Sequence, residues 1–218
     1  MAPPPSKRLG RPKDADSAET RLRLVREARA IFALKGYGAT TNKDIAASVG
    51  ITPGAIYHYV LSKSDLYVEV YEEVQSHVAD VFAKALVGRV GLLDSMIAVL
   101  DAAVELNEQD PSLAGFLFGV SRDVRHHPDL RHLFRSRGMA TAQLIQVLVD
   151  DAVDCGEILP EQRRPVEDML GSVLNGLVRF SNLIGDTERH SRAVEMLKLM
   201  LAGTLIRPVN RPGEPPPD

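Results

Sequence analysis

The sequence of 218 residues lacks the features that mark several protein classes. Its single cysteine, Cys155, excludes an internal disulfide framework and any zinc site built from several cysteines. No apolar run reaches the roughly 18 residues that a membrane-spanning helix needs. Residues 1–17 also lack the apolar core of a secretory signal. We therefore expect a cytoplasmic protein with no membrane partner.

The residue patterns of common catalytic sites are missing as well. Cys155 has no histidine near it in the sequence, and no glycine-rich loop of the phosphate-cradling kind occurs. A metal site is conceivable from three histidines and two aspartates: His126, His127, His132, Asp123 and Asp129. However, a histidine pair before Pro128 is more typical of a helix end, where imidazolium suits the helix dipole. We predict no enzymatic activity, no metal and no cofactor.

The net charge of −3 hides an asymmetry along the chain. Residues 1–63 contain 11 lysines and arginines against 5 aspartates and glutamates, a balance of +6. Residues 64–218 contain 15 against 24, a balance of −9. A basic segment ahead of an acidic body suggests that one end of the chain meets a polyanion. A chance excess of exposed arginines is the alternative, and charge alone does not decide between the two.

Helical periodicity runs through nearly the whole chain between two proline-rich ends. There is no alternating strand pattern longer than a few residues and no repeat at a solenoid period. We expect an all-α fold of about nine helices, with flexible segments at 1–16 and 207–218. The expected helices cover 18–35, 42–49, 53–59, 64–86, 91–109, 111–126, 129–154, 164–185 and 188–205.

Residues 41–60 have the layout of a helix-turn-helix, with Thr41 or Asn42 capping the first helix and Thr52 the second. The small residues Ala46 and Ala47 allow close approach of the two helices, and Gly50 stands at the tight turn. Four apolar residues suit anchoring to a third helix: Ile45, Val49, Ile51 and Ile56. Short or polar residues begin the second helix, where base edges are read in the major groove: Thr52, Pro53, Gly54 and Ala55. Groups suited to phosphates surround them: Asn42, Lys43, Tyr57, His58, Tyr59 and Lys63.

Residues 20–70 closely resemble the DNA-binding domain of the TetR/AcrR family of bacterial transcription regulators. The resemblance is carried by Ala28 and Phe32, Gly36-Tyr37-Gly38-Ala39-Thr40-Thr41, Asp44-Ile45-Ala46, Val49-Gly50-Ile51, Ile56-Tyr57-His58-Tyr59 and Ser62-Lys63-Ser64-Asp65-Leu66. Val60 stands where the family usually has Phe or Trp, and it still fits an apolar contact. The resemblance implies a basic arm at 1–16, a helix-turn-helix domain at 17–63, and a ligand-binding and dimerisation domain at 64–206. A proline-rich tail, 207–218, would follow.

The resemblance also implies roles for individual residues. The helix at 53–59 corresponds to the recognition helix, with residues 52–55 near bases. Phosphate contacts fall to Thr41, Asn42, Tyr57, Tyr59 and Lys63, while Lys43 reaches either a base or the backbone. Packing in the core or at its rim is the alternative for the two tyrosines. Arg8, Arg11 and Lys13 either lie in the minor groove or form a solvated charged tail.

Two further sets of residues belong to the body of the chain. Apolar stripes on its last two helices predict a homodimer interface: Leu170, Val173, Leu174, Leu177, Ser181, Ile184, Val194, Leu197 and Leu201. Residues able to line a pocket for a hydrophobic small molecule are Phe82, Met96, Leu100, Phe116, Leu117, Val120, Phe134 and Met139. Ordinary core packing is the alternative for both sets.

These features together predict a ligand-responsive transcriptional repressor. The homodimer would bind a palindromic operator with half-sites about 34–36 Å apart, and a small apolar effector would release it. An architectural DNA-binding protein without an effector is the alternative. A helical enzyme or carrier is a third possibility, which a failure to bind any DNA would favour.

Overall fold

The computed structural model describes residues 13–134 and 140–205, and every regular element in these two ranges is a helix. The predicted all-α class is therefore confirmed. Nine α-helices occur in the described ranges: α1 (Lys13–Ala39), α2 (Asn42–Val49), α3 (Lys63–Leu86), α4 (Leu92–Gln109), α5 (Pro111–His126), α6 (Pro128–Phe134), α7 (Ala140–Asp154), α8 (Arg163–Ile184) and α9 (Thr187–Leu201). Two 3-10 turns accompany them, η1 (Ala55–His58) and η2 (Pro160–Gln162).

Most helix positions agree with the expected ranges. The bounds of α4 and α5 match to within one residue, because Pro111 and Pro128 separate these helices from their neighbours. The single helix expected over 129–154 corresponds to α6 and α7, and residues 135–139 between them lie outside the described part of the chain.

Contacts between Cα atoms divide the described chain into two compact units. Unit 1 contains residues 13–72 and 119–134, and unit 2 contains residues 73–118 and 140–205. Helices α3 and α5 each contribute residues to both units. This division differs from the boundary expected between residues 63 and 64, because part of α5 and all of α6 belong with the helix-turn-helix.

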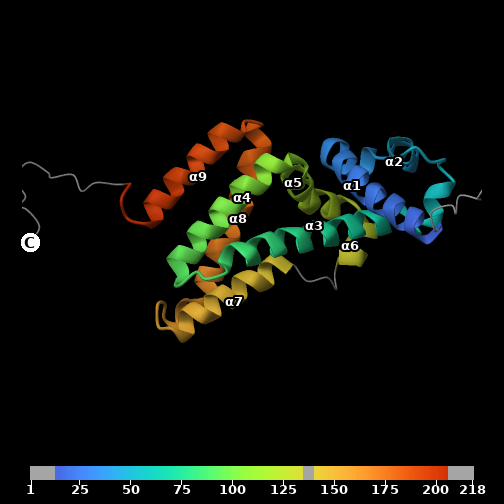
Figure 1. Ribbon diagram of the computed structural model, residues 1–218. Helices are drawn as coiled ribbons and strands as arrows, with labels where there is room; N and C mark the ends of the chain where they lie inside the picture. Colours follow the sequence, from blue (N-terminus) through green and yellow to red (C-terminus); the bar gives the residue numbers. More distant parts are fainter. Residues whose placement is uncertain (1–12, 135–139, 206–218) are drawn as a thin grey trace, which may run out of the picture. The chain divides into compact units, whose positions relative to one another are not determined.

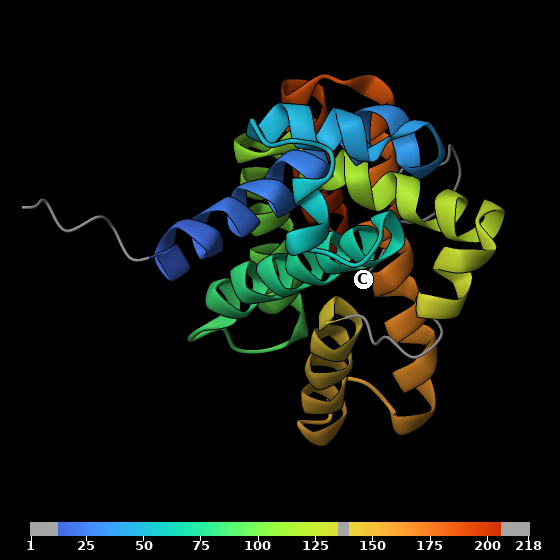
Figure 2. The same ribbon diagram turned by 90° about the vertical axis from the view of Figure 1, so that its right-hand side faces the viewer.

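Unit 1 is built on a small apolar core beneath α1 and α2, which pack against each other (Figures 1 and 2). Leu24, Ile45, Ile56 and Leu66 have no exposed surface, and Phe32 is 3% exposed. Burying such side chains contributes about 1.5–3 kcal/mol each, which fixes α1, α2 and η1 as one body.

Unit 2 is held by helix-on-helix packing of α4 with α9, α7 with α8, and α8 with α9. Met96, Val149 and Leu170 form a buried apolar cluster at the junction of α4, α7 and α8. No helix in the described residues is both long enough and apolar enough to cross a membrane.

Candidate nucleic-acid interface

Helix α2 begins at a capping box. Thr41 Oγ1 accepts the backbone N–H of Asp44 at 3.1 Å, while Asp44 Oδ2 accepts the backbone N–H of Thr41 at 2.9 Å. The hydrogen bonds from Thr41, followed by that from Lys35, lower the pKa of Asp44 to about 2. The predicted cap at Thr41 is confirmed, and it stays intact at any physiological pH.

The turn after α2 follows from Gly50. This residue adopts the left-handed conformation with φ 74° and ψ 29°, and the backbone N–H of Ile51 returns to the carbonyl of Ala46 at 2.9 Å. Ala46 has no exposed surface, so its small side chain allows the close approach that the sequence predicted.

The helix expected over 53–59 is wrong in kind, because only Ala55–His58 is helical there and it is a 3-10 turn. The carbonyls of Thr52, Gly54 and Ile56 accept N–H groups three residues ahead. Pro53 supplies no N–H, and Gly54 is a poor helix former, so a longer α-helix has little local support. Thr52 Oγ1 still accepts the N–H of Ala55 at 3.2 Å, as a cap residue should.

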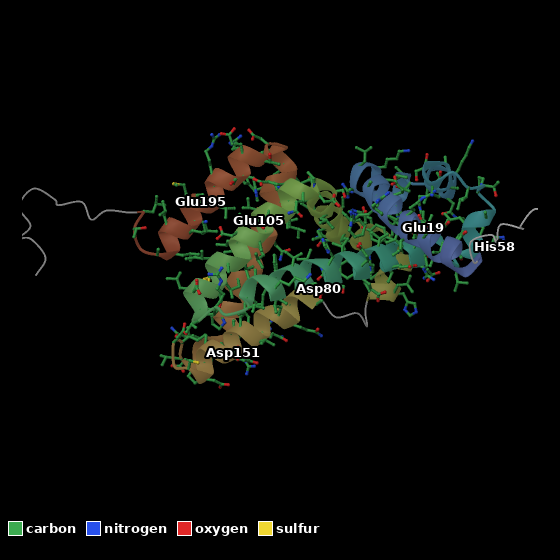
Figure 3. The ribbon with its side chains drawn as sticks, in the orientation of Figure 1. Glu19, His58, Asp80, Glu105, Asp151 and Glu195 are labelled. Carbon is green, nitrogen blue, oxygen red and sulfur yellow. The ribbon has the colours of Figure 1, made fainter. Side chains whose placement is uncertain are left out.

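Most of the predicted DNA-binding residues face solvent, and the exposed end of the unit carries His58 (Figure 3). Tyr57 is 58% exposed, so its ring is not part of the core. Exposed members of the set are Thr41, Lys43, Thr52, Pro53, Gly54, Tyr57 and His58. Half-buried members are Asn42, Ala55, Tyr59 and Lys63.

A hydrogen bond links the start of α2 to the 3-10 turn. Asn42 Nδ2 donates to the hydroxyl oxygen of Tyr57 at 3.0 Å. Because that oxygen acts as the acceptor, the phenolic hydrogen remains available to an acceptor outside the protein. A phosphate oxygen is such an acceptor, so the pair has the chemistry of a backbone contact.

Lys63 is engaged inside the chain. Its ammonium donates to the carbonyls of Tyr37 at 2.8 Å and Thr40 at 2.9 Å, and it lies 4.1 Å from the centre of the Tyr37 ring. Burial lowers the pKa of Lys63, against the opposing effect of nearby aspartates. Two of its three donors therefore close the end of α1, and its contact with a phosphate stays a prediction.

The remaining sequence predictions fall in several places. Arg8 and Arg11 lie outside the described residues, and Lys13 is the first residue of α1.

The predicted pocket set is divided between the units. Phe82, Met96, Leu100, Phe116 and Leu117 belong to unit 2, Val120 and Phe134 belong to unit 1, and Met139 is not described. Phe134 packs against the ring of Tyr71, with centroids 4.7 Å apart.

Two of the nine residues in the predicted dimer stripe are buried within unit 2. Leu170 is 6% exposed and Val194 is fully buried. The other members are half-buried: Val173, Leu174, Leu177, Ser181, Ile184, Leu197 and Leu201. The apolar residues that α8 and α9 expose are different ones: Met169, Leu183, Met196, Leu199 and Met200, each between 41% and 66% exposed.

Sequence reasoning missed a polar cluster around Tyr37. It considered Asp123 and Asp129 only as metal ligands, whereas both carboxylates bond to tyrosines in unit 1. In the described ranges no group of three or more His, Cys, Asp or Glu side chains is placed to hold a metal ion. Tyr37 stands between Gly36 and Gly38, and two glycines around an aromatic residue were the available signal of a crowded turn.

Comparison with known proteins places these residues in context. The model of the family "Bacterial regulatory proteins, tetR family" matches residues 24–70. The chain is 23% identical over 190 residues to the HTH-type transcriptional regulator UidR of Escherichia coli strain K12, covering 87% of the chain and 95% of that protein. It is 32% identical over 81 residues to the HTH-type transcriptional repressor AcnR of Corynebacterium jeikeium, covering 37% and 43%. The fold is similar to that of the transcriptional regulator FadR from Bacillus subtilis in complex with stearoyl-CoA, with a TM-score of 0.67, 17% identity, and 84% and 98% covered.

Proposed function

The chain belongs to the TetR family of bacterial regulatory proteins, and we propose that it is a repressor that binds a palindromic operator as a homodimer. Its relatives are transcriptional regulators rather than enzymes. The proposal includes release from DNA by a small apolar effector and action in the cytoplasm, where the chromosome lies.

The start of α2 and η1 form an exposed face, and this face supports the DNA-binding proposal. Lys43, Thr52, Gly54, Tyr57 and His58 are all exposed, while Ile45 and Ile56 of the same segment are fully buried and anchor it. A lysine and a phenol at the edge suit phosphates, and short side chains at the centre let the backbone approach base edges.

The homodimer is supported by the exposed apolar side chains of α8 and α9. Leu183 is 66% exposed and Met196 is 46% exposed, although each lies on a helix whose opposite face is packed. Gly171 and Gly176 have open space around them, with nothing within 4 Å of an added Cβ. We propose that a second copy of the chain covers this exposed apolar surface. A two-fold dimer would present one helix-turn-helix to each half-site of a palindrome. We place its centre on these exposed residues, beside the stripe predicted from the sequence.

Repression and an apolar effector rest on the relatives and on the composition of unit 2. AcnR is a transcriptional repressor, and FadR from Bacillus subtilis was solved in complex with stearoyl-CoA. Phe82, Leu100 and Phe116 line the interior of unit 2 here and are at most 6% exposed. We propose that a fatty-acyl or similar apolar compound enters among such residues. It would bind the DNA-incompetent state more tightly and shift the long helix α3, which contributes to both units.

Selection from a random duplex library tests the DNA-binding proposal. The full chain should enrich inverted repeats whose half-site centres lie about 10 base pairs, or a multiple of one helical turn, apart. Binding that enriches no sequence would support the alternative, an architectural DNA-binding protein without an effector. Failure to bind any duplex would contradict both.

The effector proposal has a separate test. Stearoyl-CoA, with free coenzyme A as the matched control, is added to the complex of the chain and its selected duplex. Release by stearoyl-CoA alone would support an acyl effector. Release by neither compound, with no rise in the melting temperature of the protein, would contradict that assignment and leave the DNA-binding proposal standing.

A further inference from the structure

One segment of unit 1 comes from far along the sequence. Residues 119–134, the end of α5 and all of α6, cluster with the helix-turn-helix rather than with the start of α5. Figure 1 shows the end of α5 and α6 beside the N-terminal half of α3. Since α5 is one continuous helix from Pro111 to His126, its backbone connects unit 2 directly to this segment.

A buried carboxylate joins the segment to α1. Asp123 is 5% exposed, and its Oδ2 accepts the backbone N–H of Tyr37 at 3.0 Å and the hydroxyl of Tyr67 at 3.2 Å. Its Oδ1 pairs with the guanidinium of Arg122 at 3.2 Å. A buried carboxylate with this many donors is well satisfied, so removing it would leave the N–H of Tyr37 without its partner.

The N–H of Tyr37 needs that partner because α1 is broken at Gly36. Gly36 has φ 76° and ψ 167°, a conformation restricted almost entirely to glycine, so the helical hydrogen bonds do not continue through it. Asp123 takes the place of the lost backbone acceptor. The end of α1 is therefore shaped by a residue of α5, not by α1 alone.

Tyr37 is held from other directions too. Its hydroxyl bonds to Asp129 of α6 at 2.5 Å, and its ring lies edge-on to His127 with centroids 4.9 Å apart. Lys63, at the start of α3, holds its carbonyl. A Cβ on Gly36 would lie 2.9 Å from Nη2 at the flexible end of Arg122, and one on Gly38 would lie 3.2 Å from Nε2 of His127.

The turn at 36–40 leads directly into α2. Thr40 Oγ1 donates to the carbonyl of Gly36 at 2.7 Å, and Thr41 is the cap of α2. The direction in which α2 and η1 leave this turn therefore depends on where α5 and α6 hold Tyr37.

We propose that Asp123 is a positioning residue for DNA binding, which fixes the turn 36–40 to α5 and so couples the state of α5 to the orientation of α2. This inference rests on the proposed function, since it assigns a regulatory connection to the same DNA-binding face. The coupling is reciprocal: if α5 sets the affinity for DNA, then bound DNA must restrain α5. Operator DNA can therefore serve as the probe, and no effector is needed.

The test uses the full chain with Asp123→Asn and Asp123→Ala. Asparagine keeps the size of the side chain but replaces one acceptor oxygen by a donor. The Asp123→Asn variant is therefore used for the measurement if Asp123→Ala fails to fold. The matched control is Asn107→Ala, which removes a different buried polar side chain, 7% exposed and bonded to Ser181 within unit 2. Affinity for the selected duplex is measured well below each melting temperature, together with hydrogen exchange of peptides covering 111–126 and 42–58.

We expect Asp123→Asn to weaken duplex binding by about tenfold, and Asn107→Ala to change it by less than about twofold. In the wild type, DNA should slow exchange in both peptides. In the Asp123 variants at saturating DNA, 42–58 should remain protected and 111–126 should not. Equal protection of 111–126 in the variants, or wild-type affinity, would overturn the inference. A wild-type chain that binds no duplex would instead overturn the proposed function.

Discussion

Lys43 and Lys63 are both predicted to contact phosphates, but their surroundings differ. The ammonium of Lys63 donates hydrogen bonds to two backbone carbonyls, whereas Lys43 is exposed at the start of α2. An exposed lysine that meets a phosphate displaces condensed counterions, and this makes binding salt-dependent. Lys43 is therefore the residue whose contribution should appear in the salt dependence.

Replacing Lys43 by Ala should lower the slope of log affinity against log salt concentration by about 1, nearly equally for operator and unrelated duplex. Fluorescence anisotropy titrations at several salt concentrations measure this slope. Lys84→Ala is the control, because Lys84 is equally exposed but lies at the end of α3 in unit 2. An unchanged slope for Lys43→Ala would remove Lys43 from the interface.

His190 is a buried histidine in unit 2. It is 3% exposed, and neither ring nitrogen makes a hydrogen bond of normal geometry within the described residues. Phe180 of α8 lies beside it with ring centroids 6.2 Å apart, and Arg189 lies over the same Phe180 ring. Burial lowers the pKa of His190, opposed in part by the carbonyl of Leu177 on α8 and the carboxylate of Glu108 on α4.

The lowered pKa has a consequence for stability. As pH falls below the ordinary value of 6.5, the unfolded chain gains a proton at this histidine before the native chain does, so acid favours unfolding. Urea midpoints at pH 7.5 and 5.5 should differ less for His190→Gln than for the wild type. Gln143→Ala, at an exposed position of α7, is the control: it removes no titratable group and should leave the difference unchanged. An identical pH dependence in His190→Gln and the wild type would contradict this account.

Among the helices, two glycines interrupt the helical backbone in different ways, Gly36 inside α1 and Gly50 directly after α2. Gly50 is left-handed with no atom within 4 Å of an added Cβ, whereas Gly36 lies at φ 76° and ψ 167° against Arg122. The conformation of Gly36 is the one restricted almost entirely to glycine.

Alanine at these two positions separates the effects. Gly50→Ala should lower the free energy of unfolding by about 1 kcal/mol, the cost of a left-handed alanine. Gly36→Ala should lower it by about 3 kcal/mol, because its backbone conformation is almost closed to alanine, whereas the exposed end of the Arg122 side chain can move aside. Urea denaturation of both variants gives the comparison. Equal losses would contradict the greater backbone strain assigned to position 36.

The sequence predicts helices well where local signals mark their ends, and less well where tertiary contacts do. Pro111, Gly50 and the Thr41–Asp44 cap are local, and the corresponding bounds are right. The break at Gly36 is completed by Asp123, 87 residues away, so no local pattern reveals the partner. The face of α8 that stays exposed is decided by how α4, α7 and α9 cover it, which periodicity alone does not show.

At the scale of the whole molecule, the charge asymmetry follows the two units. Residues 1–72 and 119–136 carry 15 lysines and arginines against 10 aspartates and glutamates, a balance of +5. The rest carries 11 against 19, a balance of −8. The arginines near the end of α5 thus add to the basic unit, although the sequence alone assigned them to the acidic body. Repulsion of the acidic unit from DNA should confine contacts to the basic one.

The proposed dimer makes a prediction at the same scale. Leu183→Glu should convert the sedimenting species at micromolar concentration from dimer to monomer, since a charge at a buried interface costs several kcal/mol. Leu183 is 66% exposed in the single chain, so the fold itself should tolerate the change. Val90→Glu is the control, because Val90 is also exposed in unit 2 but lies between α3 and α4. A wild-type monomer, or a dimer in Leu183→Glu, would contradict this interface.

Sequence-specific DNA binding is measured by the ratio of two affinities. The wild-type chain is titrated with its selected inverted repeat and with a scrambled duplex of the same length, at an ionic strength of about 0.15 M. The repeat should bind at least about a thousandfold more tightly than the scrambled duplex. Equal affinity for the two duplexes would contradict it.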